Sequence, residues 1–208
     1  MHIPRHFEQP DIAALHALVA AHPLTTLVTH GTAGFRANHL PMDLDPNPQP
    51  FGSLLCHVAR ANPLWRELSD GAGAIAIFHG PQAYVSPSWY PSKAESGKVV
   101  PTWNYVVVHA HGTLRVIDDA RWVKAQIEKL TIRQEAGFAH PWAVSDAPVD
   151  YTQTLLGSIV GIEIAITRLE GKWKASQNRT EPDRSGVAAG LRATGAYSMA
   201  DFVERSTG

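Results

Sequence analysis

Hydrophobic and polar residues alternate along much of the chain, with the two-residue period of strands that bury one face. The clearest run, residues 162–167, reads IEIAIT. Shorter runs rich in β-branched and aromatic residues predict further strands at residues 24–30, 35–44, 51–59, 73–80, 83–90 and 103–117. The short turns GTAG and GPQ separate neighbouring runs and favour antiparallel pairing.

The helical period is confined to a few stretches. One helix is predicted between Asp11, as its N-cap, and Pro23. A second follows Asn62 and Pro63, and the clearest covers residues 118–137. Two short helices are predicted in a tail that begins at about residue 180. Six or seven short strands with few helices indicate an α+β protein with a β-barrel core, in one domain of residues 1–208, rather than a doubly wound sheet.

Composition narrows the class of protein. Hydrophobic residues make up 44% of the 208 and charged residues 18%, which is enough for a real core. A net charge of −1 gives no overall attraction to nucleic acid. The single cysteine, Cys56, excludes an intrachain disulfide and fits a reducing compartment. No apolar run is long enough to cross a membrane, so we expect a soluble, cytoplasmic protein.

Two strand segments carry candidate binding residues. In CHVARANP, residues 56–63, a strand runs into a capped helix beside His57 and Arg60, where a phosphate could bind. A corner with a solvated arginine is the simpler interpretation. In the strand of residues 103–117, Asn104 lies among apolar neighbours, so its amide needs either a ligand or backbone partners.

The segment KWKASQNR, residues 172–179, is rich in cations and hydrogen-bond donors. It is either a solvated basic loop or a loop that closes over a phosphate or a heterocycle. His109 and His111 share one strand face, but no carboxylate or cysteine of suitable spacing accompanies them, so we expect no metal site. The common nucleotide-binding and hydrolase motifs are missing from the sequence.

Several of these segments together resemble the PaiB-like FMN-binding negative transcriptional regulators, of the flavin split β-barrel superfamily. The resemblance covers nearly the whole chain, and its most specific blocks are SPSWY, PTWNY and SQNR in this order. It implies a six-stranded antiparallel split β-barrel with peripheral helices, and a homodimer with FMN in the groove between subunits.

The resemblance also implies where the flavin binds. The ring would lie along residues 35–41, and the phosphate would meet the strand–helix corner with help from Lys93 or the Ser86 and Ser88 hydroxyls. Trp89 and Tyr90 would wall the groove, unless these rings pack the dimer interface and Lys93 is solvated. The implied cofactor-binding residues are Arg36, Ala37, Asn38, His39, His57, Ala59, Arg60, Ser88, Trp89 and Lys93, with Trp103, Asn104, Gln177 and Arg179 from the partner subunit.

Three functions follow from these expectations. A flavin-dependent oxidoreductase would need no protein acid for hydride transfer, and Arg179 or a backbone N–H would stabilise the reduced flavin. A DNA-binding repressor that senses redox state is weakly supported, because no basic helix-turn-helix pattern is present. A haem or other small-molecule binder is the alternative, with an axial ligand from His30, His39, His57, His79, His109 or His111.

Overall fold

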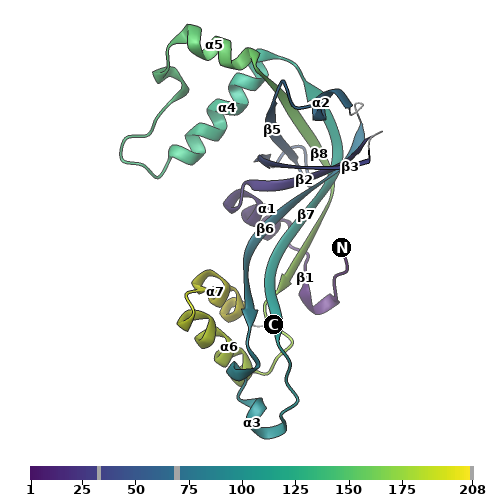
Figure 1. The fold of residues 1–208 in the computed structure, drawn as a ribbon, viewed down its shortest axis with the longest axis vertical. Helices are drawn as coiled ribbons and strands as arrows, with labels where there is room; N and C mark the ends of the chain where they lie inside the picture. Colours follow the sequence, from purple (N-terminus) through teal and green to yellow (C-terminus); the bar gives the residue numbers. More distant parts are fainter. Residues whose placement is uncertain (32–33, 68–70, 207–208) are drawn as a thin grey trace. The chain divides into compact units, whose positions relative to one another are not determined.

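The computed structural model describes residues 1–31, 34–67 and 71–206 (Figure 1). Within these residues the fold is α+β, with one antiparallel sheet and helices outside it, as the sequence predicts. The strands are β1 (Glu8–Gln9), β2 (Leu24–Gly31), β3 (Gly34–Pro41), β4 (Asp43–Asp45), β5 (Ser53–Ala59), β6 (Ala72–Val85), β7 (Thr102–Ile117) and β8 (Ile159–Lys174). Their order in the sheet is β3-β2-β6-β7-β8-β5-β4, and β1 pairs with β8.

The expected count of six strands is not confirmed, because the described residues form an eight-stranded sheet. Six of these strands have seven residues or more, whereas β1 has two and β4 has three. A strand of two or three residues is too short for alternation to reveal it.

The helices agree with the sequence where a cap marks them. They are α1 (Ile12–Ala21), α2 (Leu64–Glu67), α3 (Ser92–Ser96), α4 (Ala120–Glu135), α5 (Val149–Gly157), α6 (Glu181–Ala193) and α7 (Tyr197–Arg205). The Asp11 carboxylate accepts a hydrogen bond from the Ala13 N–H, and Asp119 caps α4 by accepting from the N–H groups of Arg121 and Trp122. No helix among the described residues is both long and apolar enough to cross a membrane.

The predicted turn at residues 80–82 is wrong, because β6 runs without a break from Ala72 to Val85. A Cβ atom at Gly80 would lie 2.9 Å from Leu18 Cδ1 and 3.1 Å from Val106 Cβ. The glycine is therefore required by close packing on the strand rather than by a turn. Residues 86–90, also predicted as strand, contain the 3₁₀ turn η2 (Pro87–Trp89).

The chain divides into two compact units. The barrel unit holds the described residues of Val19–Phe78 and of Ala110–Leu169, and the terminal unit holds Met1–Leu18, His79–His109 and the described residues from Glu170. The expectation of a single domain stays a prediction.

In the barrel unit, β2 pairs with β3, and β5 pairs with β8 in antiparallel register. β3, at one end of the strand order, also contacts β5, near the other end, which begins to close the sheet into a barrel. The inward side chains of this unit form a dry core that includes Leu27, Leu54, Phe78, Ile162 and Ile164. Helices α4 and α5 of the same unit lie side by side (Figure 1).

In the terminal unit, α6 and α7 pack together as a helical pair. The Arg192 guanidinium on α6 joins them by pairing with Asp201 at 2.8 Å and Glu204 at 2.7 Å. Helix α6 also contacts η2, where Gly190 leaves room for the Trp89 ring.

Candidate functional site

The residues predicted to bind the flavin fall in both compact units. The barrel unit holds Arg36, Ala37, Asn38, His39, His57, Ala59 and Arg60. The terminal unit holds Ser88, Trp89, Lys93, Trp103, Asn104, Gln177 and Arg179. His109 is the last residue of the His79–His109 segment of the terminal unit, whereas His111 belongs to the barrel unit.

Strand β3 presents one set of these residues on its two faces. Arg36 and Asn38 are half-buried, whereas Ala37 and His39 are exposed. The Asn38 Oδ1 atom accepts a hydrogen bond from Asn62 Nδ2 at 3.0 Å. The Asn38 Nδ2 atom is buried and has no hydrogen-bond partner among the described residues. Buried amide donors are normally paired, so this atom is suited to donate to a ligand carbonyl or ring nitrogen.

The other two polar residues of β3 already have partners. Arg36 Nη2 donates to both carboxylate oxygens of Glu67, at 2.9 and 2.7 Å. The His39 Nδ1 atom lies 3.2 Å from Thr26 Oγ1, and the His39 side chain is exposed.

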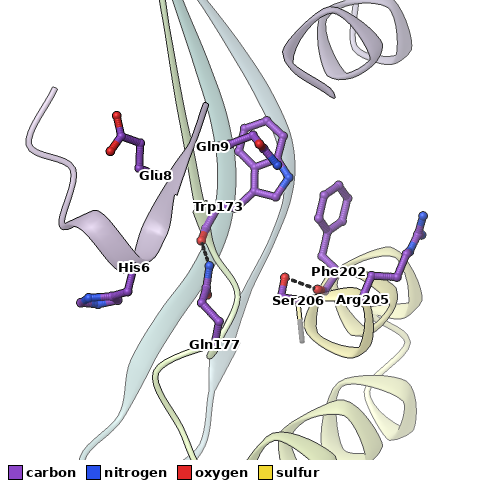
Figure 2. Close-up of a pocket in the computed structure, with 8 residues that line it drawn as sticks. All are labelled: His6, Glu8, Gln9, Trp173, Gln177, Phe202, Arg205 and Ser206. Atoms are coloured by element: carbon purple, nitrogen blue, oxygen red, sulfur yellow. Dashed lines mark hydrogen bonds between the residues drawn. The ribbon is translucent and has the colours of Figure 1, made fainter. Parts of the chain in front are cut away.

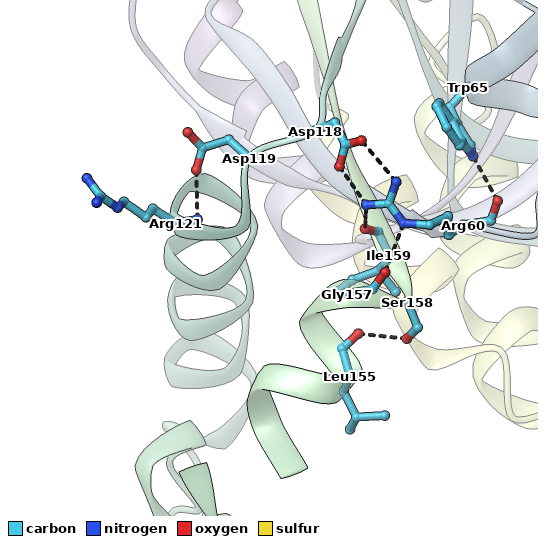
Figure 3. Close-up of polar contacts among 9 residues, drawn as sticks. All are labelled: Arg60, Trp65, Asp118, Asp119, Arg121, Leu155, Gly157, Ser158 and Ile159. Atoms are coloured by element: carbon cyan, nitrogen blue, oxygen red, sulfur yellow. Dashed lines mark hydrogen bonds and ion pairs between the residues drawn. The ribbon is translucent and has the colours of Figure 1, made fainter. Parts of the chain in front are cut away.

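Arg60, at the end of β5, holds an ion pair of its own (Figure 3). Its Nη1 and Nη2 atoms donate to the two oxygens of Asp118 at 2.9 and 2.5 Å, and Nε donates to the Gly157 carbonyl at 2.8 Å. The hydrogen bond to Asp118 raises the pKa of Arg60, and the same bond lowers the pKa of the Asp118 carboxyl. A contact between Arg60 and a phosphate stays a prediction, and Asp118 would compete for the guanidinium.

The sequence predicts a phosphate site at the strand–helix corner of residues 56–63. Apart from Arg60, the contacts that this corner offers to an anion are weak. Helix α2 has four residues within the described part of the chain, so the positive end of its dipole over this length is small. The half-buried His57 lies 2.8 Å from Gln126 Oε1 through Nδ1, which leaves one ring nitrogen for another partner.

In the terminal unit, a tight turn of residues 175–179 follows β8. The Asn104 side chain is only 1% exposed, and its Nδ2 atom donates to Ser176 Oγ at 2.8 Å. Ser176 has a φ of 62°, in the left-handed region that residues other than glycine seldom adopt. Gln177 secures the same turn, because its Oε1 atom accepts from the Ala175 N–H and its Nε2 atom donates to the Trp173 carbonyl. Asn104 thus pairs with a side chain of the SQNR segment, and the two motifs of the sequence meet here.

Three cations, Lys172, Lys174 and Arg179, gather at this turn and at the end of β8. Lys174 Nζ donates to Thr102 Oγ1 at 2.5 Å and to the Trp103 carbonyl at 2.6 Å. Burial lowers the pKa of Lys174, and the charges of Lys172 and Arg179 lower it further. In the part of the chain that the structure describes, none of these three cations pairs with a carboxylate. Repelling cations held together without an acid are suited to an anionic ligand.

Tyr90 lies next to this cluster. Its side chain is 2% exposed, and the Arg179 guanidinium carbon is 4.9 Å from its ring centroid. The Tyr90 hydroxyl is buried and finds no hydrogen-bond acceptor or donor of good geometry among the described residues. Burial raises the pKa of Tyr90, the charge of Arg179 opposes this shift, and the charge of Asp183 adds to it, so the phenol is neutral and can donate. Tyr90 was predicted only as a wall of the groove, and neither Lys174 nor Ser176 was among the predicted contacts.

The remaining predicted residues belong to the segment before β7 and to the start of that strand. Lys93 Nζ donates to Ser88 Oγ at 3.3 Å. A Cβ atom at Gly190 of α6 would overlap the Trp89 ring, so at least one face of this ring is used for packing. Trp103 is 49% exposed, and its Nε1 atom donates to Gln82 Oε1 at 3.0 Å.

Comparison with known proteins identifies the family. Residues 1–168 match the model of a family described as "Putative FMN-binding domain". The chain belongs to this family. An uncharacterized protein of Emericella nidulans is 34% identical over 222 residues, which cover 90% of this chain and 88% of that protein. Protease synthase and sporulation protein PAI 2 of Bacillus subtilis is 30% identical over 214 residues, 98% of this chain and 97% of that protein. The resemblance to the PaiB-like family is thus confirmed.

Solved structures share the fold. The flavocytochrome Anf3 of Azotobacter vinelandii superimposes with a TM-score of 0.58 at 12% identity, over 88% of this chain and 78% of that one. The predicted cofactor, FMN, is confirmed by the family. The donors of each unit fit such a group. The barrel unit holds the buried amide hydrogen of Asn38, and the terminal unit holds the neutral Tyr90 phenol and three cations that form no ion pair with a carboxylate among the described residues.

Proposed function

We propose that the chain is a homodimeric, FMN-dependent oxidoreductase in which Lys174 and Arg179 stabilise the negative charge of the reduced flavin. When bound, FMN supplies the hydride-transfer chemistry. The protein then contributes binding, orientation and electrostatic stabilisation.

The observation that carries this proposal is the set of unpaired cations at the 175–179 turn. Lys174 is desolvated and repelled by Lys172 and Arg179, so an anion placed there relieves an unfavourable charge arrangement. The buried Asn104–Ser176 hydrogen bond fixes the turn before any ligand arrives, which makes the site preorganised.

The other predicted contacts complete the proposed site. Strand β3 holds the ring through Asn38, with the Ala37 and His39 face beside it. His57, Ala59 and Arg60 meet the phosphate, and Ser88 and Lys93 of the terminal unit stay contacts that the resemblance alone implies. In the dimer, the partner subunit contributes its turn residues and the exposed Trp103 ring to the same flavin.

The midpoint potential of bound FMN tests the role of the cations. Replacing Arg179→Gln removes a positive charge but keeps hydrogen-bond donors, so the reduced anionic flavin loses stabilisation. We expect the midpoint potential to fall by about 30 mV or more, which corresponds to about 1.4 kcal/mol for a two-electron couple. Potentiometric titration against reference dyes measures this shift.

Arg192→Gln is the matched control, because Arg192 lies in the same unit but is neutralised by Asp201 and Glu204. Its potential should equal that of the unchanged protein. Equal shifts in both variants, or no shift in Arg179→Gln, would contradict the proposal.

We further propose that the protein represses transcription, as the PaiB-like resemblance implies. A relative that is 30% identical over 98% of this chain is named protease synthase and sporulation protein PAI 2. Direct DNA binding would have to be local, because the net charge is −1. Its affinity should fall steeply with salt in a gel-shift titration, and a complex that does not respond to salt would argue against repression by this route.

Haem binding is the second candidate, favoured by the fold shared with a flavocytochrome. The absorption spectrum separates the two groups, because flavin gives a yellow protein and haem gives a Soret band. A Soret band that is lost with one histidine variant would assign the axial ligand.

A further inference from the structure

A cavity of about 550 Å³ in the terminal unit lies between the N-terminal segment, the end of β8 and helix α7 (Figure 2). This volume is within the usual range of small-molecule sites. Of the residues that line it, only Gln177 belongs to the predicted flavin site.

The cavity has a fixed aromatic wall. The rings of Trp173 and Phe202 meet edge to face, with centroids 6.3 Å apart. Trp173 lies close against the strand because a Cβ atom at Gly171 would come within 2.9 Å of its Cζ3 atom. The indole therefore has little freedom to rotate toward the strand, and the wall is formed in advance.

Two neutral polar residues of the lining, Gln177 and Ser206, already have partners in the protein. Gln177 is fixed through both its amide atoms, and the Ser206 hydroxyl donates to the Phe202 carbonyl at 2.6 Å. These groups shape the cavity and leave recognition to the charged side chains.

Among the residues that line the cavity, the Arg205 guanidinium has donors available for a ligand. Its side chain is 76% exposed, it meets Asp201 Oδ2 only at 3.8 Å, and Nε donates to the Asp201 carbonyl. It lies beside the aromatic wall, with its guanidinium carbon 5.7 Å from the Phe202 centroid. On the N-terminal side the Glu8 carboxylate also lines the cavity and would repel a polyanion.

We propose that this cavity is a second ligand site, for a planar aromatic molecule that carries a single acidic group. The rings of Trp173 and Phe202 receive the planar part, and Arg205 binds the acid. The proposal depends on the cavity and not on the proposed function, although Gln177 lines the cavity and is also a predicted flavin contact.

Isothermal titration of the FMN-loaded full chain with 2-naphthoate and with uncharged 2-naphthamide tests the site. We expect 2-naphthoate to bind one per chain with a Kd of about 1 mM or lower. Arg205→Gln should weaken naphthoate at least about tenfold and change naphthamide less than about twofold. Phe202→Leu should weaken both compounds.

Trp142→Leu is the control, because Trp142 is an exposed tryptophan of the barrel unit. It should bind both compounds like the unchanged protein. Absence of binding, equal binding by all variants, or losses that include Trp142→Leu would overturn the proposal. Release of FMN by naphthoate, followed at the flavin absorbance, would also overturn it, because the cavity would then belong to the flavin site. If the chain retains no FMN, the same titration of the apo protein still decides the matter.

Discussion

Single side chains in this fold take their chemistry from burial and from partners distant in the sequence. Arg60 pairs with Asp118, and Asn104 pairs with Ser176, both across long stretches of chain. The sequence identified Arg60 and Asn104 as polar groups that need a partner. It could not supply the partner, because only the folded sheet brings β5 to the residues before α4, and β7 to the turn after β8.

Cys56 illustrates the effect of burial alone. The side chain is fully buried in β5, and burial raises the pKa of the thiol from its ordinary 9.0 to about 12. We expect no reaction with a disulfide reagent in the native protein at pH 8, and complete reaction once urea unfolds it. Rapid labelling under native conditions would contradict this.

The same shift has a pH signature in stability. Below pH 9.0 the thiol is protonated in both the folded and the unfolded chain, so it adds no pH dependence. Between pH 9.0 and about 12 the unfolded chain loses this proton and the folded chain keeps it, so the free energy of unfolding should fall as pH rises. In urea titrations across this pH range, the free energy of unfolding of Cys56→Ala should decline less than that of the unchanged protein.

At the scale of elements, alternation and caps predicted most of the structure, and the failures have physical causes. Gly80 resembled a turn residue because glycine serves both in turns and where strands approach closely. Helix α5 was missed because no capping side chain marks its start, which follows Pro148. The predicted strand of residues 35–44 merged β3 with the short β4, because only Met42 separates the two strands.

The joint between β4 and α4 depends on Asp43. Its side chain is completely buried, and its carboxylate pairs with Lys129 at 3.3 Å and with Arg133. We expect Asp43→Asn to lower the free energy of unfolding by about 1–3 kcal/mol, less than for a fully buried pair, because both cations are partly exposed. Asp45→Asn is the control, since Asp45 is 40% exposed and 3.8 Å from Lys129. It should cost less than about 0.5 kcal/mol, and equal losses in urea titrations would mean that burial of Asp43 is unimportant.

At the scale of the whole molecule, the sequence predicted the fold class, the family and the cofactor. These follow from the order of motifs along nearly the whole chain, which is typical of the family. It could not divide the site residues between the two compact units. Asn38 lies in the barrel unit and Arg179 in the terminal unit. If each flavin takes its contacts from two subunits, these two residues act on one flavin from different chains.

Mixed dimers test this arrangement directly. Asn38→Ala and Arg179→Gln should each bind FMN more weakly than the unchanged protein as homodimers, although saturating FMN still fills their sites, because every site lacks one contact. After the two variants exchange subunits, each heterodimer has one site with both contacts and one with neither. About a quarter of all sites should then bind FMN like the unchanged protein, measured by flavin fluorescence after native mass spectrometry has verified the heterodimer. If both residues act within one chain, every heterodimer site stays defective and nothing is recovered, and a monomeric protein would give the same failure by never exchanging at all.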